Sequence, residues 1–195
     1  MLSPDFPLRT GRLLLRAYTE DDLDFVYDLE SRPEVARYLF WSPRDREQAR
    51  TSLRRKIADT ALRAEGDTLT ALVLNAETGE RIGDAQLFWI SQDRRQGEIG
   101  YVIHPDQAGH GYATEAAAAM LRLGFEGLDL HRITGRLDNR NAASARVLER
   151  LGMRREACLV HNQYYKGEWA DEVVYGMLAD EWRARETASA SASTG

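Results

Sequence analysis

The sequence is poor in cysteine, and this excludes several kinds of site and location. Of its 195 residues only Cys158 is a cysteine, so the chain cannot form an intramolecular disulfide or a zinc site of the paired-cysteine type. A lone thiol is typical of a reducing compartment, and we therefore expect a cytoplasmic protein.

Long apolar runs are also missing. The N-terminus lacks the basic-then-apolar order of a signal peptide, and its longest apolar run, Leu13 to Leu15, is far shorter than the roughly 20 residues of a membrane helix. The alanine-rich stretch ATEAAAAMLRLGF is interrupted by Glu115 and Arg122, which is typical of a buried helix in a soluble protein. We expect no membrane partner.

Charge of one sign is not concentrated anywhere. The chain has 26 Lys and Arg against 31 Asp and Glu, a net charge of −5, and the basic residues are spread along it, which argues against a nucleic-acid partner. The mild acidity favours cationic ligands such as amines, although it also serves as ordinary solubility charge. Histidines at metal-ligand spacing with carboxylates are lacking too, so we expect no metal site. The four histidines are His104, His110, His131 and His161.

What is present is enough apolar sequence for a packed core. The apolar share is 43% and the aromatic share 9%, which in a chain of this length predicts one globular domain, placed at residues 1–182. The small polar stretch ETASASASTG predicts a disordered tail within residues 183–195.

Periodicity predicts an α/β (α+β) fold. Because a helix joins 97–104 to 131–138, these two strands are expected to be parallel neighbours in a mixed, mainly antiparallel twisted sheet with helices on both faces. Pro33 is expected to end the first helix, and Gly152 to cap the last one in a left-handed conformation. The predicted strands are 12–18, 69–75, 81–90, 97–104, 131–138, 153–162 and 168–178, and the predicted helices are 19–29, 43–64, 112–126 and 141–151.

The most informative stretch is EIGYVIHPDQAGHGYATEA, where a strand runs into glycines that open a helix. Gly109 and Gly111 have no side chain to repel a ligand, and the first helical turn offers free N–H groups, so a pyrophosphate fits there. The two commoner phosphate loops are excluded, because one needs an absent lysine and the other needs glycine where Thr114 stands. Spacing alone leaves a ligand-free tight turn as the alternative.

Residues His104 to Ala119 resemble the acyl-CoA loop of the GNAT N-acetyltransferase superfamily, whose glycine pattern Gly109, Gly111 and Ala113 match. LRTGRLLLRAYTEDD and RPEVARYLFW resemble blocks of the branch that acetylates ribosomal-protein N-termini, and DNRNAASARVLERLGM resembles its Asn-x-x-Ser helix. The resemblance covers about residues 8–178. It implies a GNAT fold with a splayed parallel strand pair, and acetyl-CoA as co-substrate.

The resemblance also implies which residues hold acetyl-CoA. Asn141 is expected to bind the pantetheine arm and Ser144 to lie near the thioester sulfur, although both residue types also cap helices. N–H groups at the end of the splayed strand are expected to hold the arm and polarise the thioester carbonyl. The predicted cofactor-binding residues are Val102, Ile103, His104, Gly109, His110, Gly111, Tyr112, Ala113, Thr114, Asn141 and Ser144.

Two positions depart from the family pattern, and they bear on catalysis. Ala108 stands where glutamine or arginine is usual, and Leu148 where many members carry a tyrosine used as general acid. An amine must lose a proton to react at neutral pH, and Glu98 is the candidate base, with Ser144 or the thiol's own acidity handling the leaving group. The alternatives are a structural Glu98 and a base on the later loop, where Gln163 stands.

We therefore predict an acetyl-CoA-dependent N-acetyltransferase that acts on a primary amine, with a protein or peptide N-terminus as the first acceptor. A small-molecule amine acetyltransferase, for an aminoglycoside or polyamine, and a non-catalytic acyl-CoA sensor are the alternatives. Trp41, Phe88 and Trp89 are candidates for the acceptor cleft, with a core position as the alternative for each. We expect a monomer or homodimer.

Overall fold

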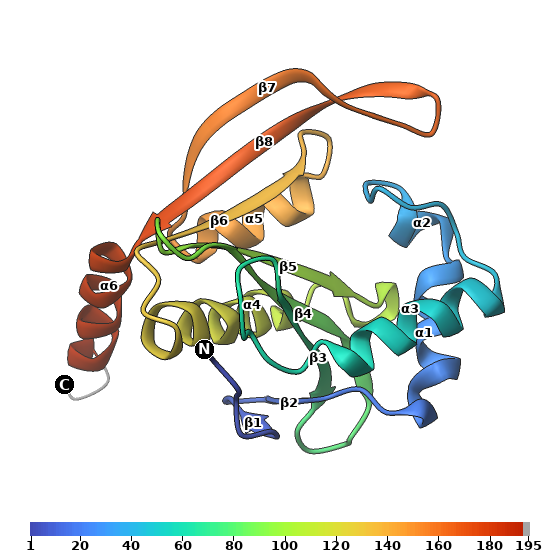
Figure 1. The fold of residues 1–195 in the computed structure, drawn as a ribbon, viewed down its shortest axis with the longest axis horizontal. Coiled ribbons are helices and arrows are strands. Elements are labelled where there is room, and N and C mark those ends of the chain that lie inside the picture. The colour runs from blue at the N-terminus through green and yellow to red at the C-terminus, as the bar shows by residue number, and fades with distance from the viewer. Residues whose placement is uncertain (193–195) are drawn as a thin grey trace.

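The computed structural model describes residues 1–192, and the side chains as far as residue 188, arranged around one eight-stranded sheet (Figure 1). The strands are β1 (Leu8–Arg9), β2 (Leu13–Arg16), β3 (Thr68–Asn75), β4 (Arg81–Ser91), β5 (Gln96–Ile103), β6 (Arg132–Asp138), β7 (Arg154–Tyr165) and β8 (Glu168–Leu178). The helices are α1 (Leu23–Ser31), α2 (Pro33–Ala36), α3 (Arg46–Ala58), α4 (Tyr112–Arg122), α5 (Ala142–Arg150) and α6 (Ala179–Ala192), with the short 3-10 turns η1 (Glu20–Asp22) and η2 (Pro105–Gln107).

The sheet has the order β1-β2-β3-β4-β5-β6-β8-β7, and every neighbouring pair is antiparallel except β5 and β6. Those two strands pair in parallel only over Gln96–Glu98 and Arg132–Thr134, although β5 continues to Ile103. The predicted mixed sheet, its parallel pair and the separation of that pair are therefore confirmed.

Apolar residues on both faces of the sheet explain why helices cover both. Along β3, Ala71 and Val73 belong to the large core beneath α4, whereas Leu72 and Leu74 belong to a second core formed with α1 and α3. Successive side chains of a strand point to opposite faces, so one strand serves both cores. Each such buried valine or leucine side chain contributes roughly 1.5–3 kcal/mol of transfer free energy.

Local signals set the helix ends, and some differ from the predictions. The Asp45 side chain accepts the Gln48 N–H at 2.8 Å and starts α3, which is shorter than the predicted 43–64 helix. Helix α1 ends at Ser31 and Pro33 begins α2, because proline is tolerated in a first helical turn. Gly152 follows α5 with φ +83°, the left-handed conformation that was predicted.

The C-terminal prediction is corrected. Helix α4 is followed by a π-helical turn, η3 (Leu123–Gly127), and α6 packs against this segment instead of forming the predicted disordered tail. Trp182 is only 3% exposed, stacks on Phe125 at 5.9 Å between ring centroids and donates to Glu126 at 2.9 Å, so tertiary packing anchors α6. Residues 193–195 of the predicted tail lie outside the described residues. Within the described range, no helix is long and apolar enough to cross a membrane.

Candidate functional site

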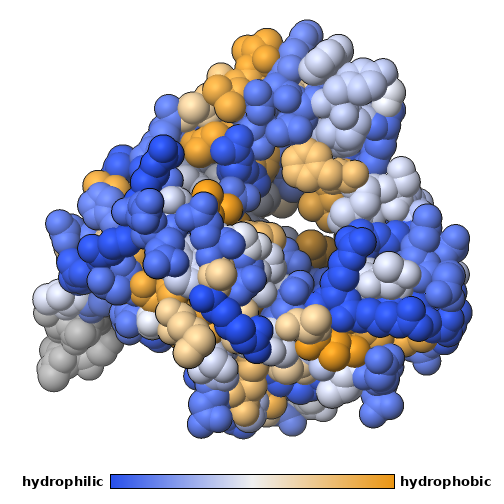
Figure 2. Space-filling view, viewed as in Figure 1, coloured by the Kyte–Doolittle hydropathy of each residue, from blue (hydrophilic) through white to orange (hydrophobic). Residues whose placement is uncertain are grey.

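A cavity of about 200 Å³ lies where β5 and β6 separate. Strand β4, the β7–β8 hairpin, α5 and the segment after α2 complete its walls, and Figure 2 shows the molecule hollowed between the hairpin and that segment. The lining includes Tyr38, Leu39, Phe40, Phe88, Glu98, Tyr101, Arg136, Asp138, Asn141, Ser144, Leu148, Gln163, Tyr165, Asp171 and Glu172.

The cavity takes side chains from both faces of the sheet. On β5, Tyr101 packs against the core beneath α4 and α5, whereas Glu98, an odd number of residues away, points to the opposite face. On β6, Leu137 and Arg136 divide in the same way. We call the face of the sheet beneath α4 and α5 the helix side, and the face that carries Glu98 the acidic side. Because the two strands have separated, the cavity is open to both sides.

The glycine loop before α4 has the geometry of an anion site. Gly109 and Gly111 have φ of +84° and +81°, and no heavy atom lies within 4 Å of the point where a Gly109 Cβ would be. Gly111 caps α4, so the N–H groups of Tyr112, Ala113 and Thr114 have no acceptor within the helix. The Thr114 hydroxyl is buried without a hydrogen-bond partner. Free donors, open space and an orphaned hydroxyl together fit a pyrophosphate.

An ion pair that the sequence analysis missed ties this loop to the N-terminal segment. Glu115 accepts from the Thr10 hydroxyl at 2.6 Å and from Arg12 Nε at 2.8 Å, while Arg12 Nη1 donates to the His110 carbonyl at 2.9 Å. Burial alone would raise the pKa of Glu115, but these hydrogen bonds lower it. The exposed His110 ring stacks on Tyr112 at 5.5 Å.

In the strand before the loop, the structure differs in part from the prediction of which N–H groups hold the pantetheine arm. The His104 N–H donates to the Ile82 carbonyl of the β4 side at 2.8 Å, and its ring lies 2.8 Å from Asp28, so His104 supports the loop from behind. Strand alternation then directs the Val102 N–H toward β4 as well. The N–H groups directed toward the opening are those of Ile103, as predicted, and Tyr101, which was missed.

Helix α5 brings Asn141 and Ser144 to the cavity. Asn141 Oδ1 accepts the Ser144 N–H at 3.1 Å, so Asn141 caps the helix while it lines the cavity. The Ser144 hydroxyl lies 2.9 Å from the Tyr101 hydroxyl, whose pKa burial raises to about 12, so the phenol stays protonated. Leu148 packs on Gly135 and offers no hydroxyl. Tyr101 is therefore a candidate that the sequence analysis missed.

Glu98 lies on the acidic side of the opening, opposite Phe88 of β4 and Thr134 of β6. Burial raises its pKa above the usual range and the neighbouring Glu172 adds to this, while Arg136 opposes it. Within the cavity, a carboxylate with a raised pKa is the group best suited to receive a proton near neutral pH.

Glu172 is a second carboxylate that the sequence analysis did not single out. Arg136 holds it with two hydrogen bonds of 3.0 and 2.5 Å, and this contact lowers the pKa of Glu172. Asn162 Nδ2 and Gln163 Nε2 also donate to it, at 2.7 and 3.4 Å. Gln163 stands where a base on the later loop was the alternative, and the carboxylate that it contacts, Glu172 of β8, is already fully hydrogen-bonded.

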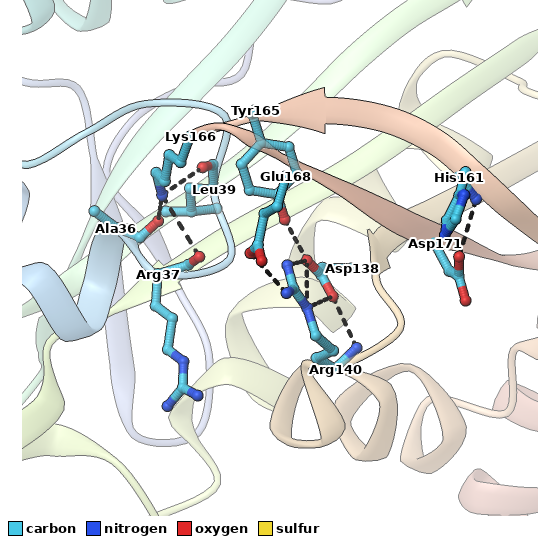
Figure 3. A network of polar contacts seen from close by, with 10 residues as sticks. All are labelled: Ala36, Arg37, Leu39, Asp138, Arg140, His161, Tyr165, Lys166, Glu168 and Asp171. Atoms are coloured by element: carbon cyan, nitrogen blue, oxygen red, sulfur yellow. Dashed lines mark hydrogen bonds and ion pairs between the residues drawn. The ribbon is translucent and has the colours of Figure 1, made fainter.

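The third carboxylate, Asp138, belongs to a network that Figure 3 shows in close-up. It accepts from Arg140 and from the Tyr165 hydroxyl, and Arg140 also pairs with Glu168 at 2.7 Å. Burial would raise the pKa of Asp138, but Arg140 and Tyr165 lower it. This network fastens the hairpin to the start of α5.

The hairpin tip is fastened on its other side to the segment after α2. The Lys166 ammonium donates to the carbonyls of Ala36, Arg37 and Leu39 (Figure 3). The Phe40 ring meets Tyr165 edge-on, with 5.5 Å between ring centroids. These contacts roof the acidic side of the cavity. The chain turns at Lys166 and Gly167, between β7 and β8.

The three aromatic candidates for the acceptor cleft have different positions. Phe88 lines the cavity, as predicted. Trp89, the next residue on β4, points to the opposite face and is buried in the core. Trp41 lies outside the cavity, where its ring stacks on Arg44 at 4.8 Å.

Comparison with known proteins agrees with this geometry. Residues 12–154 match the family described as "Acetyltransferase (GNAT) domain". The chain is 32% identical over 181 residues to "Uncharacterized N-acetyltransferase YnaD" of Bacillus subtilis (strain 168), covering 90% of this chain and 98% of that protein. It is 28% identical over 160 residues to the spermidine N(1)-acetyltransferase of Escherichia coli (strain K12), covering 82% of each. The crystal structure of a GNAT-family acetyltransferase from Bacillus anthracis superposes with a TM-score of 0.79 at 28% identity, covering 93% of this chain and all of that one.

Proposed function

Because the chain belongs to the acetyltransferase (GNAT) family, we propose that it transfers acetyl from acetyl-CoA directly to a primary amine, and that this amine is a protein or peptide N-terminus. The observation that carries the proposal is the cavity between β5 and β6, which joins Ser144 on the helix side to Glu98 on the acidic side. Both substrates reach one point through this opening, without passing around the sheet.

Acetyl-CoA supplies an activated acyl group, and the chain offers a place for each part of it. The Gly109–Thr114 loop receives the pyrophosphate through free N–H groups. The N–H groups of Tyr101 and Ile103 face the opening, where they hold the pantetheine arm together with Asn141.

The reaction needs two proton movements, one on each side of the opening. Glu98 takes one proton from the ammonium form of the acceptor. The amine nitrogen then bonds to the acyl carbon as the carbon–sulfur bond breaks. The nitrogen loses its second proton, and the leaving sulfur, beside the Ser144 hydroxyl, gains one. Glu98 returns its proton to water.

The chemistry of the amine favours an N-terminus over an internal lysine. An α-amine has a pKa near 8 and is neutral in roughly a tenth of molecules at pH 7, whereas a lysine with a pKa near 10.4 is neutral in well under one in a thousand. The RPEVARYLFW block contributes Tyr38, Leu39 and Phe40 to the cavity wall, while TGRLLLRAYTEDD supports the glycine loop instead of lining the cavity.

A polyamine is the second candidate acceptor, and the composition of the cavity wall favours it. Four carboxylates line the cavity, Glu98, Asp138, Asp171 and Glu172, against one lining guanidinium, Arg136. A cavity of this charge attracts an amine that carries several positive charges. The similarity to a spermidine N(1)-acetyltransferase supports the same acceptor.

The test is a competition at pH 7 with acetyl-CoA as donor. The acceptors are a lysine-free peptide with a free N-terminus, an N-terminally blocked peptide with one lysine, spermidine and an aminoglycoside. We expect the free N-terminus to be acetylated fastest. Faster acetylation of spermidine identifies the second candidate, and acetyl-CoA binding without thiol release from any of the four supports the sensor alternative.

A further inference from the structure

An ion pair beside Glu98 has no part in the proton movements just described. Arg136 Nε donates to Glu172 Oε1 at 3.0 Å, and Arg136 Nη2 to Glu172 Oε2 at 2.5 Å. Two parallel hydrogen bonds between a guanidinium and a carboxylate fix the orientation of both groups. Glu172 is only 4% exposed, whereas the Arg136 side chain is 39% exposed, so solvent reaches the pair from the guanidinium side only.

The sheet topology places Arg136 between two carboxylates. Strand β6 lies between β5 and β8, and Thr134, which is paired with Glu98, is two residues before Arg136 on the same face. Across the other edge of β6, Asp138 is paired with Glu172. Arg136 thus has an acid on each neighbouring strand, and its hydrogen bonds go to Glu172.

The amides of β7 explain why Glu172 holds the guanidinium. Asn162 Nδ2 donates to Oε2 at 2.7 Å and Gln163 Nε2 to Oε1 at 3.4 Å, so the carboxylate is fixed from the side opposite Arg136. Glu98 has no comparable set of donors within hydrogen-bond distance among the described residues. A fully hydrogen-bonded carboxylate is the more favourable partner for a cation.

We propose that Glu172 is a positioning residue for acetyl transfer, which holds the Arg136 guanidinium against β8 and so leaves Glu98 free to receive the proton of the acceptor amine. This inference rests on the proposed function, because it assumes that Glu98 is the base. A guanidinium paired with Glu98 itself would stabilise the ionised carboxylate and weaken it as a proton acceptor.

The electrostatic directions agree with this arrangement. The pKa of Glu98 is raised, by burial and by Glu172, and the pKa of Glu172 is lowered by Arg136. Among the other ionisable groups that face the cavity, Asp138 is bound to Arg140, and Asp171 accepts the His161 N–H at 2.9 Å. The remaining ones are the phenols Tyr38, Tyr101 and Tyr165.

The inference predicts shifts of opposite sign for two substitutions. Glu172→Gln removes a negative charge near Glu98 and releases Arg136 toward it, and both effects lower the pKa of Glu98. Arg136→Gln removes a positive charge and leaves Glu172 uncompensated, and both effects raise it. We expect the acidic limb of the kcat/KM profile to move by on the order of one pH unit, downward for Glu172→Gln and upward for Arg136→Gln.

Two measurements make the test independent of turnover alone. The Glu98 carboxyl resonance, assigned by its loss in Glu98→Gln, is titrated by carbon-13 NMR in the parent and in both variants without acetyl-CoA. Arg140→Gln is the matched control, because it removes a guanidinium that binds Asp138 and Glu168, and it should leave the Glu98 titration in place.

The outcomes separate this inference from the proposed function. If Glu98→Gln retains parental turnover, the proposed base is wrong. If Glu98→Gln is inactive while the Glu98 titration stays unmoved, or moves in the same direction in both variants, the role of Glu172 is overturned and the base stands. Each variant has its own expected sign, so if only one variant folds, a shift of the wrong sign or no shift in that variant overturns the role of Glu172.

Discussion

At the scale of single residues, the carboxylates of the cavity differ in what neutralises them. Glu172 has Arg136 and Asp138 has Arg140, and both pKa values lie below the usual range. Glu98 is half-buried and has no arginine hydrogen-bonded to it among the described residues, and its pKa is raised. This difference is why we propose Glu98, the acid with the fewest hydrogen bonds, as the proton acceptor.

Glu98→Gln tests that role directly. The amide keeps the size of the side chain but cannot accept a proton, so kcat should fall by on the order of 10²–10⁴ at neutral pH. The loss should shrink as pH rises, because the acceptor amine then deprotonates without help. Steady-state rates between pH 6 and 10 provide the measurement, with Glu168→Gln at the exposed hairpin tip as the control. A variant within a fewfold of the parent at every pH would make Glu98 structural.

Tyr101 and Ser144 provide a second prediction at this scale. Because the two hydroxyls are 2.9 Å apart, we expect Tyr101 to orient the serine hydroxyl toward the leaving sulfur. Tyr101→Phe and Ser144→Ala should each lower kcat by on the order of tenfold, and the double variant should be little worse than either, since coupled groups are not additive. Additive losses in this double-mutant cycle would mean that the hydroxyls act separately.

At the scale of elements, two connections shape the site: the turn into α4 and the β7–β8 hairpin. The turn requires left-handed backbone at Gly109 and Gly111, which glycine adopts without strain. The hairpin requires bonds at its tip, because it projects from the rest of the sheet (Figure 1). Each connection yields a prediction of its own.

Gly111→Val should abolish acetyl-CoA binding without unfolding the protein. A branched Cβ at φ +81° strains the cap of α4 and occupies the surface where backbone and pyrophosphate meet. Calorimetric titration measures the affinity and thermal melting the fold. Gly79→Val is the matched control, because Gly79 has φ +73° in the β3–β4 turn, with nothing within 4 Å of its Cβ position. Equal affinity in both variants would show that the loop is only a turn.

Lys166→Met should loosen the roof of the cavity. The methionine retains much of the length of the side chain but cannot donate to the carbonyls of Ala36, Arg37 and Leu39. We expect faster amide hydrogen exchange at the hairpin tip, and a several-fold rise in KM for the acceptor with little change in acetyl-CoA affinity. Tyr164→Phe, a change at an exposed ring of the same hairpin, is the control. An unchanged exchange rate at the tip would contradict the fastening role of Lys166.

At the scale of the whole molecule, a buried carboxylate joins distant parts of the chain. Asp22 is 0% exposed and binds Arg16 of β2 at 2.7 and 2.8 Å, Arg81 of β4 at 2.8 Å, and the Thr19 N–H at 2.9 Å. Burial would raise its pKa, but these partners lower it well below the usual range. Since the native pKa is the lower one, this carboxylate stabilises the fold above the unfolded-state pKa near 4, and the contribution is lost as pH falls through the native pKa.

Asp22→Asn should therefore lower the free energy of unfolding by about 1–3 kcal/mol at neutral pH, because hydrogen bonds to a charged group are lost while the partly exposed Arg16 and Arg81 remain screened by solvent. The difference from the parent should shrink as pH falls below 4, because the unfolded parent then takes up a proton that the native carboxylate binds only at much lower pH. Urea unfolding at several pH values measures both effects, with the exposed Asp21→Asn as the control. A difference that stays constant with pH would assign the loss to packing instead of charge.

The sequence by itself determined the features that depend on local pattern. Alternating and 3.6-residue periods located most strands and helices, and the glycines before Tyr112 indicated the anion loop, because the backbone conformation they permit is a property of the residue. Residues distributed along the chain also matched the family, which later comparison confirmed over residues 12–154.

Only the tertiary structure decided which groups meet. Tyr101 and Ser144 are 43 residues apart in the chain, and Arg136 and Glu172 are 36 apart, yet each pair is in hydrogen-bond contact. The direction of the Val102 and His104 N–H groups depended on the pairing of β5 with β4. The packing of α6 against the rest of the molecule depended on the burial of Trp182. A carboxylate becomes a base or a counter-ion according to burial and the cations within reach, and those are set by packing between distant segments.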